Sequence, residues 1–125
     1  MIDDDNEVRQ TVSTALSLNG FEVTDVDNGD DAIKVMSSEF DLVVCDLFMP
    51  DTDGVATILA IRKIYAATPI ILITGGGRHF PVGGGGLDDL LKSVEFFGVT
   101  HFLMKPFRPS QLIELAKRAL SPAEK

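Results

Sequence analysis

Apolar positions along this chain alternate between two spacings, one typical of helices and one typical of strands. Helical spacing predicts helices around residues 8–16, 32–36, 55–62, 87–94 and 112–120, with Ser110 as the cap of the last one. Alternating or continuous apolar runs predict strands over residues 21–26, 41–46, 69–74 and 100–104. Because helices and strands follow one another along the whole chain, the pattern predicts an α/β fold, a parallel sheet with helices on both faces.

Two places depart from this regular alternation. Only Met1 and Ile2 precede the first acids, so we expect the first strand to be truncated or missing in this chain, with residues absent upstream. Residues 75–86 contain seven glycines in twelve positions. Because ordering glycine costs more backbone entropy than ordering other residues, we predict a mobile Gly-rich insertion within a single domain that spans residues 1–125.

Charge and composition narrow the classes of function. The net charge of −8 argues against direct binding of nucleic acid, because phosphate backbones attract Lys and Arg. No apolar run approaches the roughly 20 residues that a membrane helix needs, and the three aspartates after Ile2 argue against a signal peptide. Cys45 is the only cysteine and cannot form an internal disulfide, so we expect a buried thiol in a cytoplasmic protein.

Polar residues follow the ends of several predicted strands. Asp3 and Asp4, then Asp46, Thr74 and Lys105, each come directly after an apolar segment. The carboxyl ends of parallel strands meet at one edge of a sheet, so we expect these side chains to converge there. Carboxylates about 4 Å apart repel by roughly 4 kcal/mol per pair at an effective dielectric of 20, which calls for a compensating cation. An all-oxygen site beside one lysine suits Mg²⁺ and phosphate chemistry.

Four segments of the chain resemble the receiver domains of response regulators in two-component signalling. They are DDDNEVR at 3–9, DLFMPDTDG at 46–54, PIILIT at 69–74 and FLMKPF at 102–107. Each motif is weak alone, but four in order cover nearly the whole chain. The resemblance implies a flavodoxin-like, doubly wound parallel sheet of five strands with five helices.

This resemblance also implies a phosphoacceptor switch. Asp46 would take a phosphoryl group from the phosphohistidine of a sensor histidine kinase or a histidine phosphotransfer protein. Asp4, Asp46 and the backbone carbonyl of Phe48 would bind Mg²⁺ directly, and Asp3 would act on it through water. The expected protein is therefore a regulatory domain, not an enzyme with turnover on external substrates.

The resemblance gives roles to the remaining strand-end residues as well. Thr74, the Gly75 amide and Lys105 would hold the phosphoryl oxygens, and the peptide bond from Lys105 to Pro106 would be cis. Phosphorylation would draw Thr74 inward and let Phe102 rotate. That movement would change the face formed by the fourth helix, the last strand and the last helix, where a downstream protein or a second copy of the chain would bind.

Two other functions stay open at this point. One is a degenerate receiver that acts as a protein-interaction module without phosphorylation. The short first strand and the insertion at 75–86 favour this function, whereas the complete set of acids, hydroxyl and lysine argues against it. A Mg²⁺-dependent phosphohydrolase with Asp46 as nucleophile would usually need a second acid where Phe48 stands. The resemblance implies that positions 48 and 76 flank the path of a hydrolysing water. Phe48 is bulky and apolar and Gly76 has no side chain, so we predict slow self-dephosphorylation.

Overall fold

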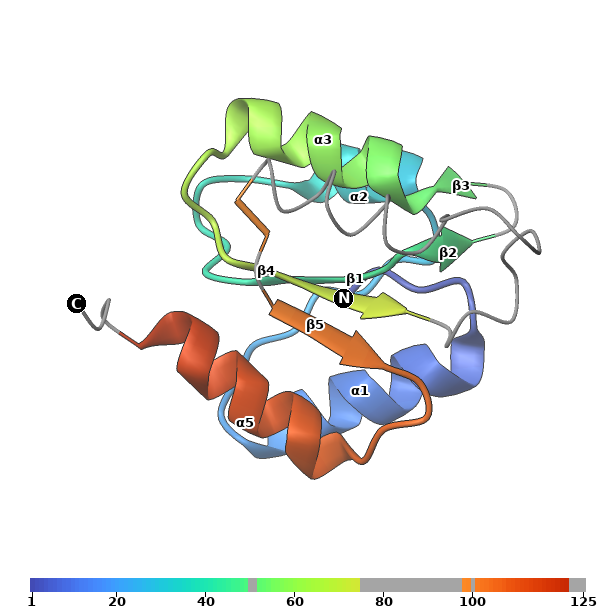
Figure 1. Ribbon diagram of the computed structural model, residues 1–125, viewed down its shortest axis with the longest axis vertical. Helices are drawn as coiled ribbons and strands as arrows, with labels where there is room; N and C mark the ends of the chain where they lie inside the picture. Colours follow the sequence, from blue (N-terminus) through green and yellow to red (C-terminus); the bar gives the residue numbers. More distant parts are fainter. Residues whose placement is uncertain (50–51, 75–97, 100, 122–125) are drawn as a thin grey trace, which may run out of the picture.

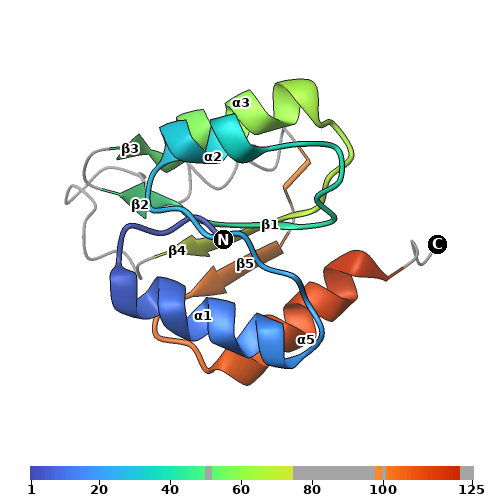
Figure 2. The ribbon, with the colours of Figure 1, turned by 180° about the vertical axis from the view of Figure 1, so that it is seen from behind.

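The described part of the chain has three layers, with helices on both faces of a parallel sheet (Figure 1). The computed structural model describes residues 1–49, 52–74, 98–99 and 101–121. One face carries helices α1 (Asn6–Leu18) and α5 (Pro109–Leu120), and the other carries α2 (Gly29–Val35) and α3 (Gly54–Ile64). Figure 2 shows the same layers from behind.

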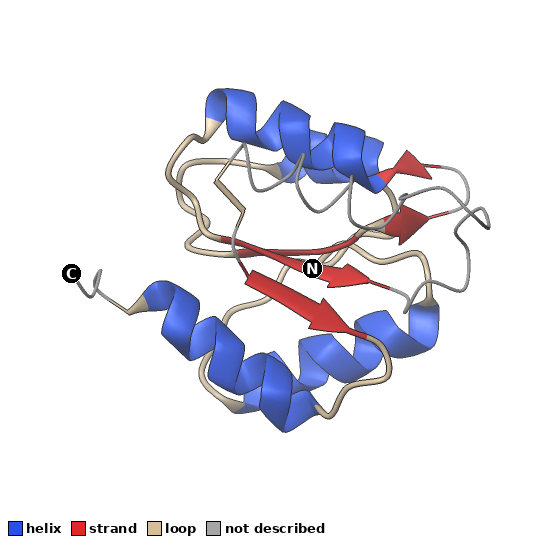
Figure 3. Cartoon of the chain, viewed as in Figure 1, coloured by secondary structure: helices blue, strands red, loops and turns tan. Residues whose placement is uncertain are grey.

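The sheet is continuous over three parallel strands, drawn in red in Figure 3. They are β1 (Val43–Asp46), β4 (Ile70–Thr74) and β5 (His101–Met104), in the order β1-β4-β5. Cys45 pairs with Leu72, and Leu72 pairs with Phe102 on its other side. This parallel α/β architecture confirms the predicted fold class.

The other side of β1 is occupied by the first residues of the chain. Ile2 makes single parallel bridges with Cys45 and with Val26. Its N–H donates to the carbonyl of Val44 at 2.8 Å, and its carbonyl accepts from the N–H of Asp46 at 2.8 Å. Ile2 therefore takes the central place between Val26 and β1, although the segment is too short to count as a strand.

The strand predicted over 21–26 is wrong except at its last residue. Val26 pairs with Ile2, whereas residues 21–25 form no ladder. Segments 20–24 and 39–42 instead border a groove of about 870 Å³ beside Met1. Residues 21–26 do alternate between apolar and polar side chains. A strand also needs a partner segment, however, and the neighbouring Met1 and Ile2 provide only two residues to pair with.

Strand pleating divides the apolar core between the two faces of the sheet. The cluster under α2 and α3 is formed by Ile2, Ala32, Val43, Cys45, Leu47, Ile58, Ile61, Ile70, Leu72 and Val99. The cluster under α1 and α5 is formed by Val12, Leu16, Val44, Ile71, Ile73, Leu112, Ile113 and Ala116. Successive residues of β1 and β4 thus face opposite layers, which explains why both strands are apolar up to their last residue.

The first and last helices differ in how their N-termini are capped, and the cap predicted for the last helix is not the one observed. Asp5 caps α1, since its Oδ1 accepts from the N–H groups of Glu7 and Val8 at 2.9 and 3.2 Å. The predicted cap at Ser110 is wrong, because α5 already begins at Pro109. Proline has no N–H to satisfy and a fixed φ that suits the first helical position, so the cap is Arg108 and the helix begins two residues earlier than predicted.

Several predictions concern residues outside the described ranges. These are the Gly-rich insertion at 75–86, the helix at 87–94, and Thr100 at the start of the last predicted strand. Among the helices that are described, none is both long and apolar enough to cross a membrane.

Candidate functional site

The predicted strand-end residues lie at one edge of the sheet. Asp46 ends β1, Thr74 ends β4, Lys105 follows β5, and Asp3 follows the bridge residue Ile2. The N–H of Lys105 donates to the carbonyl of Thr74 at 2.8 Å, which ties the ends of β4 and β5 together. Topology alone therefore brings these residues together, as the sequence predicted.

Three carboxylates gather at this edge. One carboxylate oxygen from each of Asp3, Asp4 and Asp46 lies within 4.8 Å of the other two. Asp3 and Asp46 are buried, at 0% and 2% exposure, whereas Asp4 faces solvent. Asp3 Oδ1 accepts from the N–H of Asp5 at 2.8 Å, but its buried Oδ2 accepts no hydrogen bond from the described residues.

Lys105 supplies a single ammonium to this cluster. Its Nζ lies 3.3 Å from Asp46 Oδ2 and 3.6 Å from Asp3 Oδ2. The peptide bond between Lys105 and Pro106 is cis, as predicted. One ammonium beside three carboxylates leaves the cluster with an excess of negative charge.

This excess appears in the acid–base behaviour of the cluster. Burial raises the pKa of Asp3 to about 7; the hydrogen bond from the Asp5 amide opposes the rise, and the charge of Asp46 adds to it. Burial and the charge of Asp46 also raise the pKa of Asp4. Burial alone would lower the pKa of Lys105, but Asp46 and Asp3 outweigh it and raise that pKa. Each shift opposes accumulation of negative charge, so a bound cation would relieve it.

Helix α3 begins at Gly54, close to the backbone of Asp46. A two-residue pairing between β2 (Phe48–Met49) and β3 (Thr52–Asp53), which the sequence did not predict, leads directly to Gly54. A Cβ at Gly54 would lie 2.3 Å from the carbonyl oxygen of Leu47 and 2.8 Å from that of Asp46. Only glycine allows the helix to start so close to the backbone of Asp46.

The predicted switch residues lie on neighbouring strands. Thr74 is buried at the end of β4, and half-buried Phe102 packs against the cluster under α2 and α3. Phe102 pairs with Leu72, two residues before Thr74. Gly75 and the predicted fourth helix lie outside the described residues, so the structure describes only part of the predicted switch.

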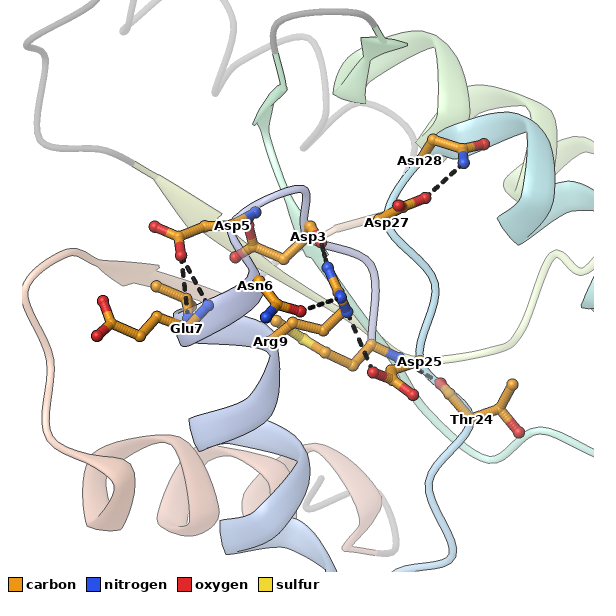
Figure 4. A network of polar contacts seen from close by, with 11 residues as sticks. Asp3, Asp5, Asn6, Glu7, Arg9, Thr24, Asp25, Asp27 and Asn28 are labelled. Carbon is orange, nitrogen blue, oxygen red and sulfur yellow. Dashed lines mark hydrogen bonds and ion pairs between the residues drawn. The ribbon is translucent and has the colours of Figure 1, made fainter.

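Sequence reasoning assigned no role to Arg9, which contacts the acidic segment. Its Nη1 donates to the carbonyl oxygen of Asp3 at 2.9 Å, and its Nε lies 3.1 Å from Asp25 Oδ2 (Figure 4). The only signal in the sequence was the position of Arg9 in the DDDNEVR segment, one helical turn after the cap residue Asp5.

The donor set fits a hard divalent cation. Carboxylate oxygens are the ligands that Mg²⁺ prefers in proteins, and Mg²⁺ commonly retains waters while it binds one or two carboxylates. Oδ2 of Asp3, which accepts no hydrogen bond from the described residues, could accept one from such a water. The cluster of Asp3, Asp4 and Asp46 is therefore suited to Mg²⁺.

Comparison with known families gives this arrangement a context. A sequence model described as the response regulator receiver domain matches residues 1–117. This chain belongs to the response regulator receiver domain family. Receiver domains are regulatory phosphoacceptor domains that generally bind Mg²⁺ through acidic residues.

Curated relatives of this receiver domain include longer regulators. The chain is 31% identical over 98% of its length to a transcriptional regulatory protein CpxR homolog of Haemophilus influenzae, and covers 52% of that protein. It is 30% identical over 98% of its length to the transcriptional regulatory protein ResD of Bacillus subtilis, and covers 48% of it. The chain thus spans about half the length of these relatives.

Solved structures agree on the fold. The receiver domain of NtrX from Brucella abortus superposes with a TM-score of 0.81 at 27% identity, covering 98% of this chain and 97% of that one. The chemotaxis response regulator CheY4 of Vibrio cholerae gives a TM-score of 0.78 at 30% identity, covering 95% and 94%.

Proposed function

We propose that this receiver domain is a Mg²⁺-dependent switch in which Asp46 accepts a phosphoryl group from a sensor histidine kinase or a histidine phosphotransfer protein. The observation that carries the proposal is the surroundings of Asp46. Its buried carboxylate has two further acids within 4.8 Å and the ammonium of Lys105 at 3.3 Å.

The transfer is a displacement at phosphorus. A carboxylate oxygen of Asp46 forms the new O–P bond as the N–P bond of the donor's phosphohistidine breaks and the electron pair returns to the imidazole. Mg²⁺ would be held by Asp4, Asp46 and the carbonyl of Phe48, with Asp3 acting through water, and when bound it neutralises charge on the phosphoryl oxygens. The ammonium of Lys105 lies 3.3 Å from Oδ2 of this carboxylate.

The phosphoryl group would then be held by this chain's own donors. Lys105 would pair with one phosphoryl oxygen, and the Thr74 hydroxyl and the Gly75 amide would donate to others. Inward movement of Thr74 would let Phe102 rotate, and the change would reach the face formed by the fourth helix, β5 and α5. A local charge event of this kind biases a two-state element.

The partners follow from this scheme. A downstream protein, or a second copy of the chain, would bind the altered face in the cytoplasm. Relatives named as transcriptional regulators are about twice as long as this chain, and the receiver itself carries a net charge of −8. We therefore assign any contact with DNA to other parts of such proteins, and to this domain only phosphoryl acceptance and slow self-dephosphorylation.

The test is phosphorylation by a small acyl phosphate in the presence of Mg²⁺, followed by intact mass. We expect a gain of one phosphoryl group that disappears in Asp46→Asn or in excess chelator. Asp30→Asn, at an exposed acid in the first turn of α2, is the matched control and should behave as the wild type. A wild-type protein that gains no mass, or an Asp46→Asn variant that gains as much, would contradict the proposal.

One observation favours a second candidate, a degenerate receiver that binds its partner without phosphorylation. Ile2, which precedes the metal-binding acids, is joined to the sheet by single bridges only. This function predicts no mass gain in the same experiment, and partner binding that is equal in the wild type and in Asp46→Asn.

A further inference from the structure

Arg9 joins three separate parts of the acidic end of the molecule. From the first helix, its guanidinium donates to the carbonyl oxygen of Asp3 at 2.9 Å through Nη1 and to Asp25 at 3.1 Å through Nε. Its third nitrogen, Nη2, donates to the side chain of Asn6. Figure 4 shows the guanidinium between these groups, and only 15% of the side chain is exposed.

The bond to Asp3 acts on the peptide unit that carries two metal-binding candidates. The carbonyl of Asp3 belongs to the peptide group that links Asp3 to Asp4, so its orientation sets the direction in which both side chains leave the backbone. On the other side of Asp3, the N–H donates to the carbonyl of Val26 at 3.2 Å. These two bonds fix the turn between the bridge at Ile2 and the start of α1.

The sheet gives this segment little other support. Asp46 is held by a four-residue ladder, whereas Asp3 and Asp4 follow a single bridge residue. Asp25 lies in a segment without strand or helix, so the arginine ties one irregular segment to another. Arginine suits this role because its planar fork donates to several acceptors in a fixed geometry.

We infer that Arg9 is a positioning residue that holds the Asp3–Asp4 peptide in the orientation needed for Mg²⁺ binding. The inference rests on the proposed function. Arg9 acts through the backbone of Asp3 and not as a ligand, as a group behind the ligands of a metal site does.

The direction in which Mg²⁺ affinity changes when Arg9 is replaced distinguishes positioning from simple electrostatics. Arg9 is a cation beside an acidic cluster, so removing its charge would on Coulombic grounds alone strengthen the binding of Mg²⁺. Loss of positioning weakens the binding instead. The two explanations therefore predict opposite changes for a neutral substitution at this residue.

The experiment measures Mg²⁺ affinity by calorimetric titration and, in parallel, the rate of phosphorylation by a small acyl phosphate as a function of Mg²⁺ concentration. We expect Arg9→Gln to raise the half-saturating Mg²⁺ concentration about tenfold, the size typical for groups behind metal ligands, while the rate at saturating Mg²⁺ falls less than about threefold. Arg9→Lys keeps the charge and can reach fewer acceptors, so its shift should be intermediate. Arg118→Gln, at an exposed arginine paired with Glu114, is the matched control and should show no shift.

Each outcome decides a separate point. A half-saturating concentration that is unchanged or lower in a folded Arg9→Gln protein overturns the positioning role while the proposed function stands. If that variant fails to fold, Asn6→Ala removes an uncharged anchor of the guanidinium and should raise the half-saturating concentration, by less than Arg9→Gln does; no rise overturns the inference. A wild type that is never phosphorylated overturns the proposed function, and this inference with it.

Discussion

On one side of β1 the sheet is continuous, because every residue from Val43 to Asp46 pairs with a residue of β4. On the other side a single residue, Ile2, makes one bridge to Cys45 and one to Val26. Both sides deliver acids to the same edge of the sheet. The ladder side contributes Asp46, and the bridge side contributes Asp3 and Asp4.

The acids of one site are therefore held in two different ways. Asp46 ends the buried strand β1, and Lys105 directly follows β5, which pairs with β4 over four residues. The acids Asp3 and Asp4 depend on a few individual hydrogen bonds, among them that from Arg9. A cation bound by Asp46 together with Asp3 and Asp4 would stabilise the folded state that binds it. We expect this effect to be largest for the segment of Asp3 and Asp4, which has the fewest backbone bonds.

The largest expected difference is in the free energy of unfolding after two core substitutions, one in β4 and one at Ile2. Ile71→Ala removes a fully buried side chain from β4 and should lower the free energy of unfolding by about 4 kcal/mol. Ile2→Ala, also at a buried isoleucine, should cost about 2 kcal/mol, because a segment held by single bridges can relax around the cavity. Urea unfolding measures both, and an equal or larger loss for Ile2→Ala would show that the two sides do not differ.

A smaller effect is expected at the start of α3, on the ladder side. Gly54→Ala pushes a Cβ against the carbonyl oxygens of Leu47 and Asp46 and should cost about 2 kcal/mol. It should also slow phosphorylation, because it displaces the backbone of Asp46. Gly20→Ala, at a positive φ of 90° with nothing within 4 Å, should cost about 1 kcal/mol and leave phosphorylation unchanged. Equal phosphorylation rates in both variants would disprove the role given to Gly54.

A third prediction concerns the charge of Asp3 in metal-free buffer. The pKa of Asp3 is about 7 in the folded protein against an ordinary value of 3.8, so the folded state binds this proton more tightly than the unfolded chain does. The resulting stabilisation is complete below about pH 3.8 and is lost as the pH rises through about 7.

Between these values, ionisation of Asp3 should lower the free energy of unfolding as the pH rises, by up to about 1 kcal/mol per pH unit. The measurement compares urea unfolding of the wild type and Asp3→Asn from pH 5 to pH 8 in chelator. The wild type should lose stability relative to the variant as the pH rises. Parallel pH profiles would contradict the raised pKa.

The smallest expected effect is on the free energy of unfolding when the segment before Ile2 is lengthened. Three apolar residues added before Met1 would enter the groove bordered by segments 20–24 and 39–42 and lengthen the pairing along β1. Their added hydrogen bonds should raise the free energy of unfolding by about 1 kcal/mol. A Gly-Ser-Gly extension of the same length is the control, and equal stabilities would mean that the groove does not accept a strand.

Sequence patterns predicted the parts of this molecule that depend on local order. The structure places the apolar run ending in Asp46, the buried strand ending in Thr74 and Lys105, directly after β5, at one edge of the sheet. A strand end is predictable because the topology of a parallel sheet directs every such end to the same place.

What the sequence left out depends on pairing and on contacts between distant segments. Residues 21–25 alternate like a strand but have no partner ladder, and proline chemistry moved the start of α5 to before Ser110. The contact from Arg9 to Asp25 joins residues sixteen positions apart and has no signature in local spacing. The raised pKa of Asp3 likewise follows from burial that only the folded chain creates.

Calorimetric titration with Mg²⁺ tests the central claim most directly, that acids from both sides of the sheet form one cation site. We expect a single ion to bind the wild type and Asp30→Asn equally, and to bind at least tenfold more weakly to Asp4→Asn and Asp46→Asn, the loss expected when a charged ligand is removed. Equal affinity in all four proteins would contradict the account.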